Sequence, residues 1–357
     1  MFGKVLSNYF TNLWRLLRGS RLPDPLAVSY CITTCCNLAC AYCEDFGRQR
    51  NAEQSPPLSL TDARRLLAII RRATGSLIFT GGEPLLYPDI QALVTYARRE
   101  LHFKHLSLIT NGLLLAEQAG LLGELDRLVV SLDSVDPGTW HQTLGVEADV
   151  ARRILKAVAA TARQQEKLGF QMAAHCVVMP DALGAALNVL DFCVAHGILF
   201  SFSPQAVNNW PHYELLASNA YRSFVSHVID LKLGGAPILG SMAYLKSMLT
   251  FEPFACYPLL VPRVMPDGGL VYPCRPIERG GDAHGGRDVN LLEAGDWQVA
   301  VERAVARYGL PPLTCGSCYQ QCYAEPSLMQ ARPLALLREL VVFAPSRRGR
   351  IHDYAPG

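Results

Sequence analysis

Residues 34–47 read TCCNLACAYCEDFG, and the rest of the chain is organised around this stretch. It follows a β-like apolar run over residues 26–33 and places Cys36, Cys40 and Cys43 in a C-x3-C-x2-C spacing. Three thiolates this close can hold three corners of a cubane iron–sulfur cluster and leave its fourth iron open, whereas a structural zinc site needs a fourth nearby ligand. Ordinary buried cysteines or a zinc knuckle are the alternatives. The spacing therefore predicts a cluster whose open iron can bind a substrate or cofactor.

Length and composition predict one large α/β domain with a smaller appendage. The chain has 357 residues, of which 50% are hydrophobic and 18% charged, so it can bury a large core. A formal net charge of +2 gives no strong case for nucleic acid. Most of the 12 cysteines fall in two groups, and C-x2-C groups in an α/β chain favour metal ligation in a reducing compartment over disulfides. Because no apolar run reaches the ~20 residues of a membrane span and no signal peptide is recognisable, we expect a cytoplasmic protein.

Residues 1–25 form a separate N-terminal segment with an amphipathic helical pattern. Apolar side chains from Phe2 to Leu17 recur every three to four residues and leave Lys4, Arg15, Arg18 and Arg21 as the basic complement. Such a helix can lie on an anionic membrane surface. Packing of the apolar stripe on the helix's own domain is the alternative, and the pattern alone favours it.

From residue 26 onward, short apolar runs alternate with longer helical patterns, which predicts a parallel sheet with right-handed crossovers. The predicted strands cover residues 26–33, 76–80, 105–110, 127–132, 170–178 and 198–203. The predicted helices cover residues 60–73, 89–100, 114–123, 148–167, 184–196 and 213–233. Periodicity alone does not separate an open sheet from a barrel.

Three further motifs follow predicted strands and, with the cysteine triad, resemble the radical S-adenosylmethionine (SAM) superfamily. They are Gly81-Gly82-Glu83-Pro84, Thr110-Asn111-Gly112 and Ser131-Leu132-Asp133-Ser134. In that superfamily the open iron is chelated by the amino and carboxylate groups of SAM, and an aromatic residue such as Tyr42 precedes the last cysteine. The resemblance implies a partial (β/α)6 TIM-like barrel over residues 26–235, with ligands at the C-terminal ends of the strands.

The resemblance also assigns the cofactor-binding residues. The GGEP motif would contact the amino group of SAM, and Asn111, Ser131 and Asp133 would lie near its ribose and carboxylate. From the residues alone, glycines at a strand end admit a ligand to the backbone, and Glu83 can accept from a cationic amine. Turn and cap chemistry explains the same glycine, asparagine, serine and aspartate residues without a ligand.

Two other stretches are candidate ligand contacts at the barrel mouth. Residues 177–179 can form an apolar shelf for adenine, although core packing explains them equally well. The polar and aromatic loop over residues 203–213 is our candidate for substrate contact, with a surface turn as the alternative. His212, within this loop, carries no catalytic assignment, and we identify no catalytic acid or base.

The second cysteine group lies in a Pro- and Gly-rich region over residues 236–357, after a linker near Gly234. An Asp267-Gly268-Gly269 turn between apolar residues predicts a hairpin that brings Cys256 and Cys274 together. The region resembles the SPASM/twitch extension of radical SAM enzymes, but it has fewer cysteines than the full SPASM pattern. This departure favours one auxiliary [4Fe-4S] cluster. The candidate ligands are Cys256, Cys274, Cys315 and Cys318, with Cys322 as the spare; a zinc ribbon is the alternative.

A last apolar segment, residues 333–343, is too short to span a membrane.

The resemblance implies an enzyme that reductively cleaves SAM to a 5′-deoxyadenosyl radical and takes a hydrogen atom from a peptide or secondary-metabolite substrate. It also implies a flavodoxin or ferredoxin as electron donor. A lipid-modifying enzyme at the membrane surface is a second candidate, for which the amphipathic N-terminus is the only support. A non-catalytic iron–sulfur electron carrier is a third, and it would need neither GGEP nor an open iron.

Overall fold

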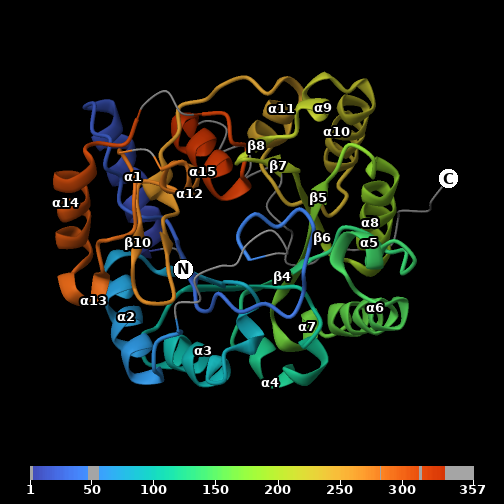
Figure 1. Ribbon diagram of the computed structural model, residues 1–357, viewed down its shortest axis with the longest axis horizontal. Coiled ribbons are helices and arrows are strands. Elements are labelled where there is room, and N and C mark those ends of the chain that lie inside the picture. The colour runs from blue at the N-terminus through green and yellow to red at the C-terminus, as the bar shows by residue number, and fades with distance from the viewer. Residues whose placement is uncertain (1–2, 47–55, 282, 313–315, 334–357) are drawn as a thin grey trace.

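A computed structural model describes residues 3–46, 56–281, 283–312 and 316–333 (Figure 1). Its central element is an eight-stranded sheet with the order β10-β9-β1-β2-β3-β4-β5-β6. Strands β1 to β6 run parallel to one another, and within the described residues no pairing joins β6 back to β10. The sheet is therefore the partial barrel that the sequence predicts. Its first six strands are Val28–Cys31, Ser76–Thr80, His105–Thr110, Arg127–Ser131, Gln171–Val178 and Leu199–Pro204.

Helices follow the strands in sequence and lie around the outside of the curved sheet (Figure 1). They are α2 (Leu60–Ala73), α3 (Ile90–Arg99), α4 (Ala119–Leu122), α6 (Ala148–Ala162), α7 (Gln165–Leu168), α8 (Leu183–His196), α9 (Tyr213–Ala217) and α10 (Asn219–Leu233). The predicted strands and helices are confirmed to within a few residues at most ends. Two predicted helices are divided: the Ser218 side chain accepts from the Tyr221 amide and begins α10, which separates it from α9.

The two faces of the sheet differ in character because side chains alternate along each strand. One face is apolar and fully buried, with Phe79, Leu108 and Val130 at 0% exposure. The other face carries small and polar side chains, which are Thr80, Ser107, Ser131, His175, Ser201 and Ser203. The helix predicted over residues 114–123 is in fact a 3-10 turn η2 (Leu115–Glu117) followed by the short α4. Short elements without a sequence prediction follow several strands: a 3-10 turn η1 (Pro84–Leu86), α5 (Trp140–Leu144) and a hairpin of β7 (Ala206–Val207) and β8 (Trp210–Pro211).

The C-terminal region forms backbone hydrogen bonds with both edge strands of the parallel sheet, β1 and β6. Strand β9 (Arg263–Val264) pairs in parallel with β1, and β10 (Leu270–Val271) pairs antiparallel with β9, which confirms the predicted hairpin. On the other side, the amide of Phe200 in β6 donates to the carbonyl of Pro237 at 2.7 Å. The remaining elements are α11 (Met242–Thr250), η3 (Pro258–Leu260), α12 (Arg275–Arg279), α13 (Leu291–Ala294), α14 (Trp297–Tyr308) and α15 (Gln321–Ala331). The two sides of the predicted boundary at residue 235 thus share one sheet.

Helix α1 (Gly3–Leu17) lies beside α15 (Figure 1) and is predicted correctly as a helix. The expectation that its apolar stripe packs on its own domain is wrong for four members, because Leu6, Phe10, Trp14 and Leu17 are exposed. The residues that α1 buries are Asn8, Tyr9 and Asn12. No described helix is long and apolar enough to cross a membrane. The predicted apolar segment 333–343 lies almost entirely outside the described residues.

Candidate functional site

The cysteine triad lies in the loop that follows β1, inside the ring of helices (Figure 1). Cys36, Cys40 and Cys43 are all partly buried. Burial raises the pKa of Cys40 to about 12, and the neighbouring charges of Asp133, Cys43 and Cys36 add to this rise. Backbone amides donate to two of the sulfurs, from Leu38 to Cys36 at 3.5 Å and from Phe46 to Cys43 at 3.4 Å. The three thiols thus lie within electrostatic reach of one another, and backbone amides donate to the sulfurs of Cys36 and Cys43.

The Gly81-Gly82 pair at the end of β2 holds this loop by direct backbone contact. The Gly82 amide donates to the carbonyl of Thr33, and the Glu83 amide to that of Cys35, both at 2.8 Å. A Cβ atom on Gly82 would lie 2.2 Å from the Cys35 carbonyl oxygen, far inside any allowed contact. Glycine is thus required here for close approach between the strand end and the cysteine loop.

Glu83 is fully buried, and its carboxylate serves the protein itself. Oε1 accepts from the Leu85 amide at 3.0 Å and from the Thr110 hydroxyl at 2.8 Å, and Oε2 accepts from the Asn111 amide at 2.8 Å. Burial raises the pKa of Glu83, against the opposite effect of these donors. We expected this side chain to face a cationic amine; in the structure it joins the end of β2 to the end of β3. Pro84, next in the motif, is buried at the start of η1.

Two of the other predicted residues contact the cysteine loop. Asn111 donates to the Asn37 side chain at 2.8 Å, and its Nδ2 lies 4.0 Å from the Cys36 sulfur. Asp133 accepts from the Tyr42 hydroxyl through Oδ2 and from the Val177 amide through Oδ1 at 2.7 Å. Burial raises the pKa of Asp133 to about 6, although both hydrogen bonds act in the other direction.

Ser131 lies at the end of β4, in register with His175 of β5. Val178, in the predicted adenine shelf, is at 0% exposure and belongs to the core, whereas Val177 is partly buried. His212 accepts from the Glu214 amide at 3.3 Å and caps α9. The neighbouring β7–β8 hairpin does reach the cysteine loop, since the Asn209 amide donates to both carboxylate oxygens of Glu44 at 3.2 and 3.3 Å.

A charge cluster that sequence reasoning missed follows the last cysteine of the triad. Arg263 lies 3.0 Å from one oxygen of Asp45, and Arg275 donates to the other. Arg279 lies 3.4 Å from Glu44 and 3.6 Å from Asp45. Burial alone would raise the pKa of Asp45, but the arginines, with Arg263 foremost, hold it at about 2. We call these five residues the arginine lock. It connects the cysteine loop to β9 and to α12, which begins directly after Cys274.

The second group of cysteines is only partly assembled among the described residues. Cys274 and Cys318, each 6% exposed, form one buried cluster with Tyr323, and Cys256 packs against it. The Ser327 hydroxyl lies 3.9 Å from the Cys256 sulfur. Cys322 is exposed near the start of α15, and the predicted ligand Cys315 lies outside the described residues. Across the described part of the chain, no group of three or more His, Cys, Asp or Glu residues is arranged to hold a single metal ion.

The first cysteine loop suits a cubane cluster by the chemistry of its donor set. It offers the three thiols of the triad within one short loop, with amide donors to two of them, and Cys35 in the same loop is a further free thiol that is exposed. The hydroxyl of Thr34, just before the triad, is buried without a hydrogen-bond partner in the described part of the protein. Such a polar atom is explained by a group that binds there. Cys36, Cys40 and Cys43 would therefore hold the cluster.

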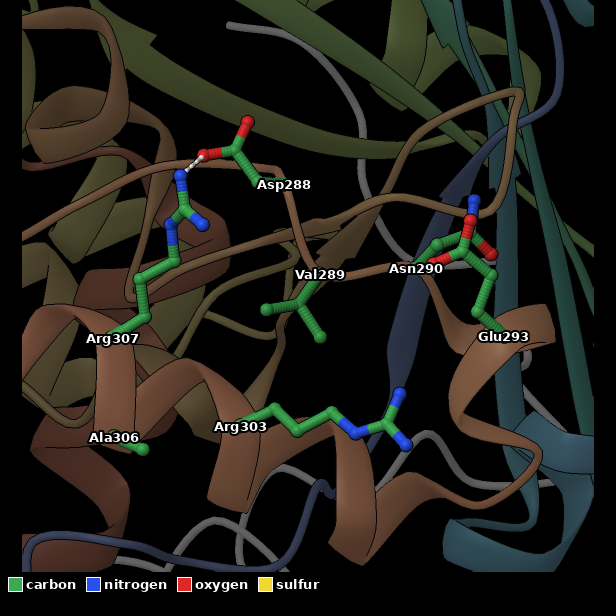
Figure 2. Close-up of a pocket in the computed structure, with 7 residues that line it drawn as sticks. All are labelled: Asp288, Val289, Asn290, Glu293, Arg303, Ala306 and Arg307. Carbon is green, nitrogen blue, oxygen red and sulfur yellow. Dashed lines mark ion pairs between the residues drawn. The ribbon is translucent and has the colours of Figure 1, made fainter.

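Two hollows of the described surface lie away from these residues. One, with a volume of about 440 Å³, is lined by Asp288–Asn290, Glu293, Arg303, Ala306 and Arg307. Figure 2 shows Arg307 reaching Asp288, to which it is ion-paired at 2.7 Å, while Arg303 extends from the same helix α14. None of the predicted site residues lines this hollow, so it contributes nothing to the assignment of the site.

Comparison with known proteins finds a family likeness over the stretch that contains the cysteine loop. Residues 30–175 match the Radical SAM superfamily. The probable GTP 3′,8-cyclase of Methanococcus aeolicus is 28% identical over 173 residues, which are 47% of this chain and 55% of that protein. GTP 3′,8-cyclase 2 of Mycobacterium bovis is 40% identical over 120 residues, 32% of this chain and 33% of that protein. The chain thus spans about half, or less, of the length of these curated relatives.

Solved structures share the fold over most of the chain. Streptococcus suis SuiB bound to the precursor peptide SuiA aligns with a TM-score of 0.59 and 19% identity, covering 84% of this chain and 73% of that one. Native anSMEcpe with bound AdoMet aligns with a TM-score of 0.56 and 15% identity, covering 87% of this chain and 98% of that one. At these identities the likeness supports the fold, including the C-terminal region.

Proposed function

Because residues 30–175 match the Radical SAM superfamily, we propose that the protein is a SAM-cleaving enzyme of that superfamily. When bound, a [4Fe-4S] cluster and SAM would supply a 5′-deoxyadenosyl radical that takes a hydrogen atom from the substrate. The observation that carries the proposal is the convergence of three thiols with the ends of β2, β3 and β4. Gly82, Asn111 and Asp133 reach the cysteine loop from these three strands.

The chain's own residues would position the cofactors and exclude water. Cys36, Cys40 and Cys43 would hold the cluster, and the lock at Glu44 and Asp45 would fix the loop. The hydrogen bond from Tyr42 to Asp133 would keep the aromatic side chain against the same site. Glu83 would act by joining β2 to β3, leaving the backbone of the glycine pair to face SAM. In this proposal, orientation of a substrate C–H bond is the principal contribution of the protein.

For the substrate we propose a peptide or a related secondary metabolite. A solved neighbour, SuiB, carries a precursor peptide, and the alignment with it covers 84% of this chain. The β7–β8 hairpin supports a substrate site near the triad, because Asn209 bonds to Glu44 next to Cys43. The GTP named for the curated relatives is less well supported, since the Methanococcus aeolicus likeness extends over 55% of that protein.

We also propose one auxiliary cluster held by Cys256, Cys274, Cys315 and Cys318, with Cys322 as the spare. The shared buried cluster of Cys274, Cys318 and Tyr323, with Cys256 against it, supports this choice. A zinc ribbon is the competing proposal, and it predicts zinc in place of the extra iron by elemental analysis. A flavodoxin or ferredoxin would supply the electron, and a cytoplasmic location would suit these clusters.

Anaerobic reconstitution with iron, sulfide, dithionite and SAM tests the proposal. We expect 5′-deoxyadenosine to form, and we expect no product when Cys36, Cys40 and Cys43 are replaced together by Ala. That triple variant should retain about four irons per chain in the auxiliary cluster. A protein with intact clusters that forms no 5′-deoxyadenosine would instead be an electron carrier. Adding GTP or a candidate peptide to the same reaction separates the two substrate classes by which one is consumed.

A further inference from the structure

We propose that the outer face of α1 docks this protein on an anionic lipid surface. Four large apolar side chains form this face: Leu6 is 44% exposed, Phe10 59%, Trp14 55% and Leu17 80%. They follow one another at intervals of four, four and three residues, so they share one side of the helix. The proposal concerns where the protein binds and holds for any substrate of the enzyme.

Helix α1 is turned the opposite way from an ordinary surface helix. A surface helix normally places its apolar stripe against the core and its polar side in water. Here the buried side is held through polar groups: Asn8 donates to the carbonyls of Pro25 at 2.8 Å and Ala73 at 3.0 Å. Asn12 donates to the carbonyl of Asp24 at 2.8 Å, and its Oδ1 accepts from the Asp24 amide at 2.7 Å.

Residues of α15, near the C-terminal end of the described chain, hold α1 in the same orientation. The Tyr9 hydroxyl donates to the carbonyl of Met329 at 3.3 Å, and the Gln330 side chain donates to the carbonyl of Tyr9 at 3.2 Å. Rolling α1 to bury its apolar face would break these bonds and leave buried amides unsatisfied, which destabilises the protein. The outward direction of the four apolar side chains is therefore built into the packing of the helix.

The four exposed apolar side chains would gain hydrophobic free energy if another apolar surface covered them. Burial of a large apolar side chain is favourable in proportion to the area removed from water, and here four such side chains are adjacent on one helix. Single exposed apolar residues are common on protein surfaces, but a contiguous row indicates an interaction site. The row of apolar side chains lies on the convex outer surface of the helix. We therefore expect it to match a flat lipid layer better than the peptide-binding groove of a partner protein.

The charge of the N-terminal segment indicates which kind of lipid surface α1 would bind. Residues 1–23 contain Lys4, Arg15, Arg18 and Arg21 and no Asp or Glu, whereas the whole chain carries a net charge of only +2. Arg15 is ion-paired with Asp24 at 2.8 Å, so the cationic excess of this segment comes from Lys4, Arg18 and Arg21. The Arg18 guanidinium lies over the Trp14 ring at 3.8 Å, which places a cation and an amphipathic aromatic ring side by side on the exposed face. Basic residues beside an apolar row favour anionic lipid headgroups, while two copies of this segment would repel one another.

Vesicle co-sedimentation tests the proposal with vesicles of phosphatidylcholine alone and of phosphatidylcholine with phosphatidylglycerol. We expect the wild-type protein to bind the anionic vesicles at least about tenfold more tightly than the neutral ones, with weaker binding at high salt. The variant Phe10→Glu/Trp14→Glu should lose about tenfold or more of this binding. The matched control, Leu187→Glu/Leu233→Glu, changes two exposed leucines of other helices and should bind like the wild type.

A second variant and a second measurement guard against a folding defect. Leu6→Ser/Leu17→Ser removes apolar surface without adding charge, and it should weaken binding while the circular dichroism spectrum stays unchanged. The proposal is overturned if the wild type stays in the supernatant with anionic vesicles, or if both stripe variants bind as well as the control. It is equally overturned if light scattering shows a wild-type dimer that the stripe variants convert to monomers, since a second copy would then cover this face.

Discussion

At the scale of single residues, the site depends on buried carboxylates whose oxygens are used by the protein. Glu83 accepts hydrogen bonds from three groups that lie at the ends of β2 and β3. Asp133 accepts one bond from the cysteine loop and one from β5. Glu83 therefore ties together the ends of two paired strands, and Asp133 ties the cysteine loop to β5.

Replacing Glu83 by Gln should destabilise the protein by about 2–3 kcal/mol, because an amide NH2 would face donors that now bond to a buried carboxylate. The measurement is urea unfolding of cluster-free protein. Glu100→Gln is the matched control: Glu100 is exposed and its change should stay within about 0.5 kcal/mol. Equal effects of the two substitutions would show that the three bonds to Glu83 contribute little.

His175 should make stability depend on pH. Burial lowers its pKa to about 4, and its ring nitrogens lie 3.0 and 3.1 Å from the hydroxyls of Ser201 and Ser203. The unfolded chain takes up the proton near pH 6.5, before the folded protein does, so stability is complete above pH 6.5 and falls as the pH drops toward 4. The loss is up to about 3 kcal/mol.

His175→Gln should flatten this decline in cluster-free protein, as followed by urea midpoints at pH 7.5 and pH 5. Part of the slope should remain, because burial also lowers the pKa of His105 to about 4. His141→Gln, at an exposed histidine, should leave the decline as it is. An unchanged decline in His175→Gln would assign the pH dependence to other groups.

At the scale of elements, the arginine lock makes β9 and α12 part of the first cysteine site. Its three arginine side chains are 21%, 12% and 11% exposed, so the charges interact largely out of water. Since the two acidic partners follow Cys43 directly, a shift of β9 or α12 would move the cysteine loop as well. The region with the second cysteine group is thereby coupled to the geometry of the first.

Asp45→Asn should cost about 3–5 kcal/mol of stability, because it leaves the buried Arg263 charge without its partner. Asp62→Asn removes an exposed pair with Arg65 at 2.9 Å and should cost less than about 1 kcal/mol. The double variant Asp45→Asn/Arg263→Met should recover part of the loss, because it also removes the stranded charge. Chemical denaturation of the four proteins measures these differences, and a small effect of Asp45→Asn would show that the lock is solvated.

At the scale of the whole molecule, the C-terminal region holds both sides of the sheet. It reaches β1 through β9 and β6 through Pro237, and one contiguous hydrophobic core runs from Val28 to Leu328. The domain division at residue 235 that composition predicts therefore crosses shared hydrogen bonds and a shared core.

We expect the cluster-free protein to unfold in a single transition, with coincident curves from circular dichroism and tryptophan fluorescence. Trp14 and Trp140 report on the first part of the chain and Trp297 on the last, so two independent domains would give two fluorescence steps. Such a pair of steps, separated in denaturant concentration, would contradict the shared core.

Local chemistry explains which features were predictable from sequence. Strands β2 and β3 end where predicted, because their apolar runs stop at Gly81 and Asn111. The triad was predictable from its spacing alone. The partners of Asp45 were not, since Arg263 and Arg275 lie more than two hundred residues away. The sequence indicates only that two acidic residues follow Cys43. Which residues pair with them is decided by tertiary contacts.

The outward face of α1 was missed for a different reason. Periodicity shows that a helix has an apolar side, but it does not show which side meets the protein. Asn8 and Asn12 carry that information, because asparagines inside a helix are poor helix formers and here bond to distant carbonyls. Their spacing of four residues marks the side of α1 that packs.

The pairing of β9 with β1 has a consequence for how the chain is made. The ribosome delivers β1 early, but the strand that covers its free edge is completed only at residue 264. Until then the nascent polypeptide exposes an unpaired strand edge next to the cysteine loop, a state open to mispairing with other chains. The emergence of residues 263–279 closes this edge and supplies the arginines that pair with Glu44 and Asp45.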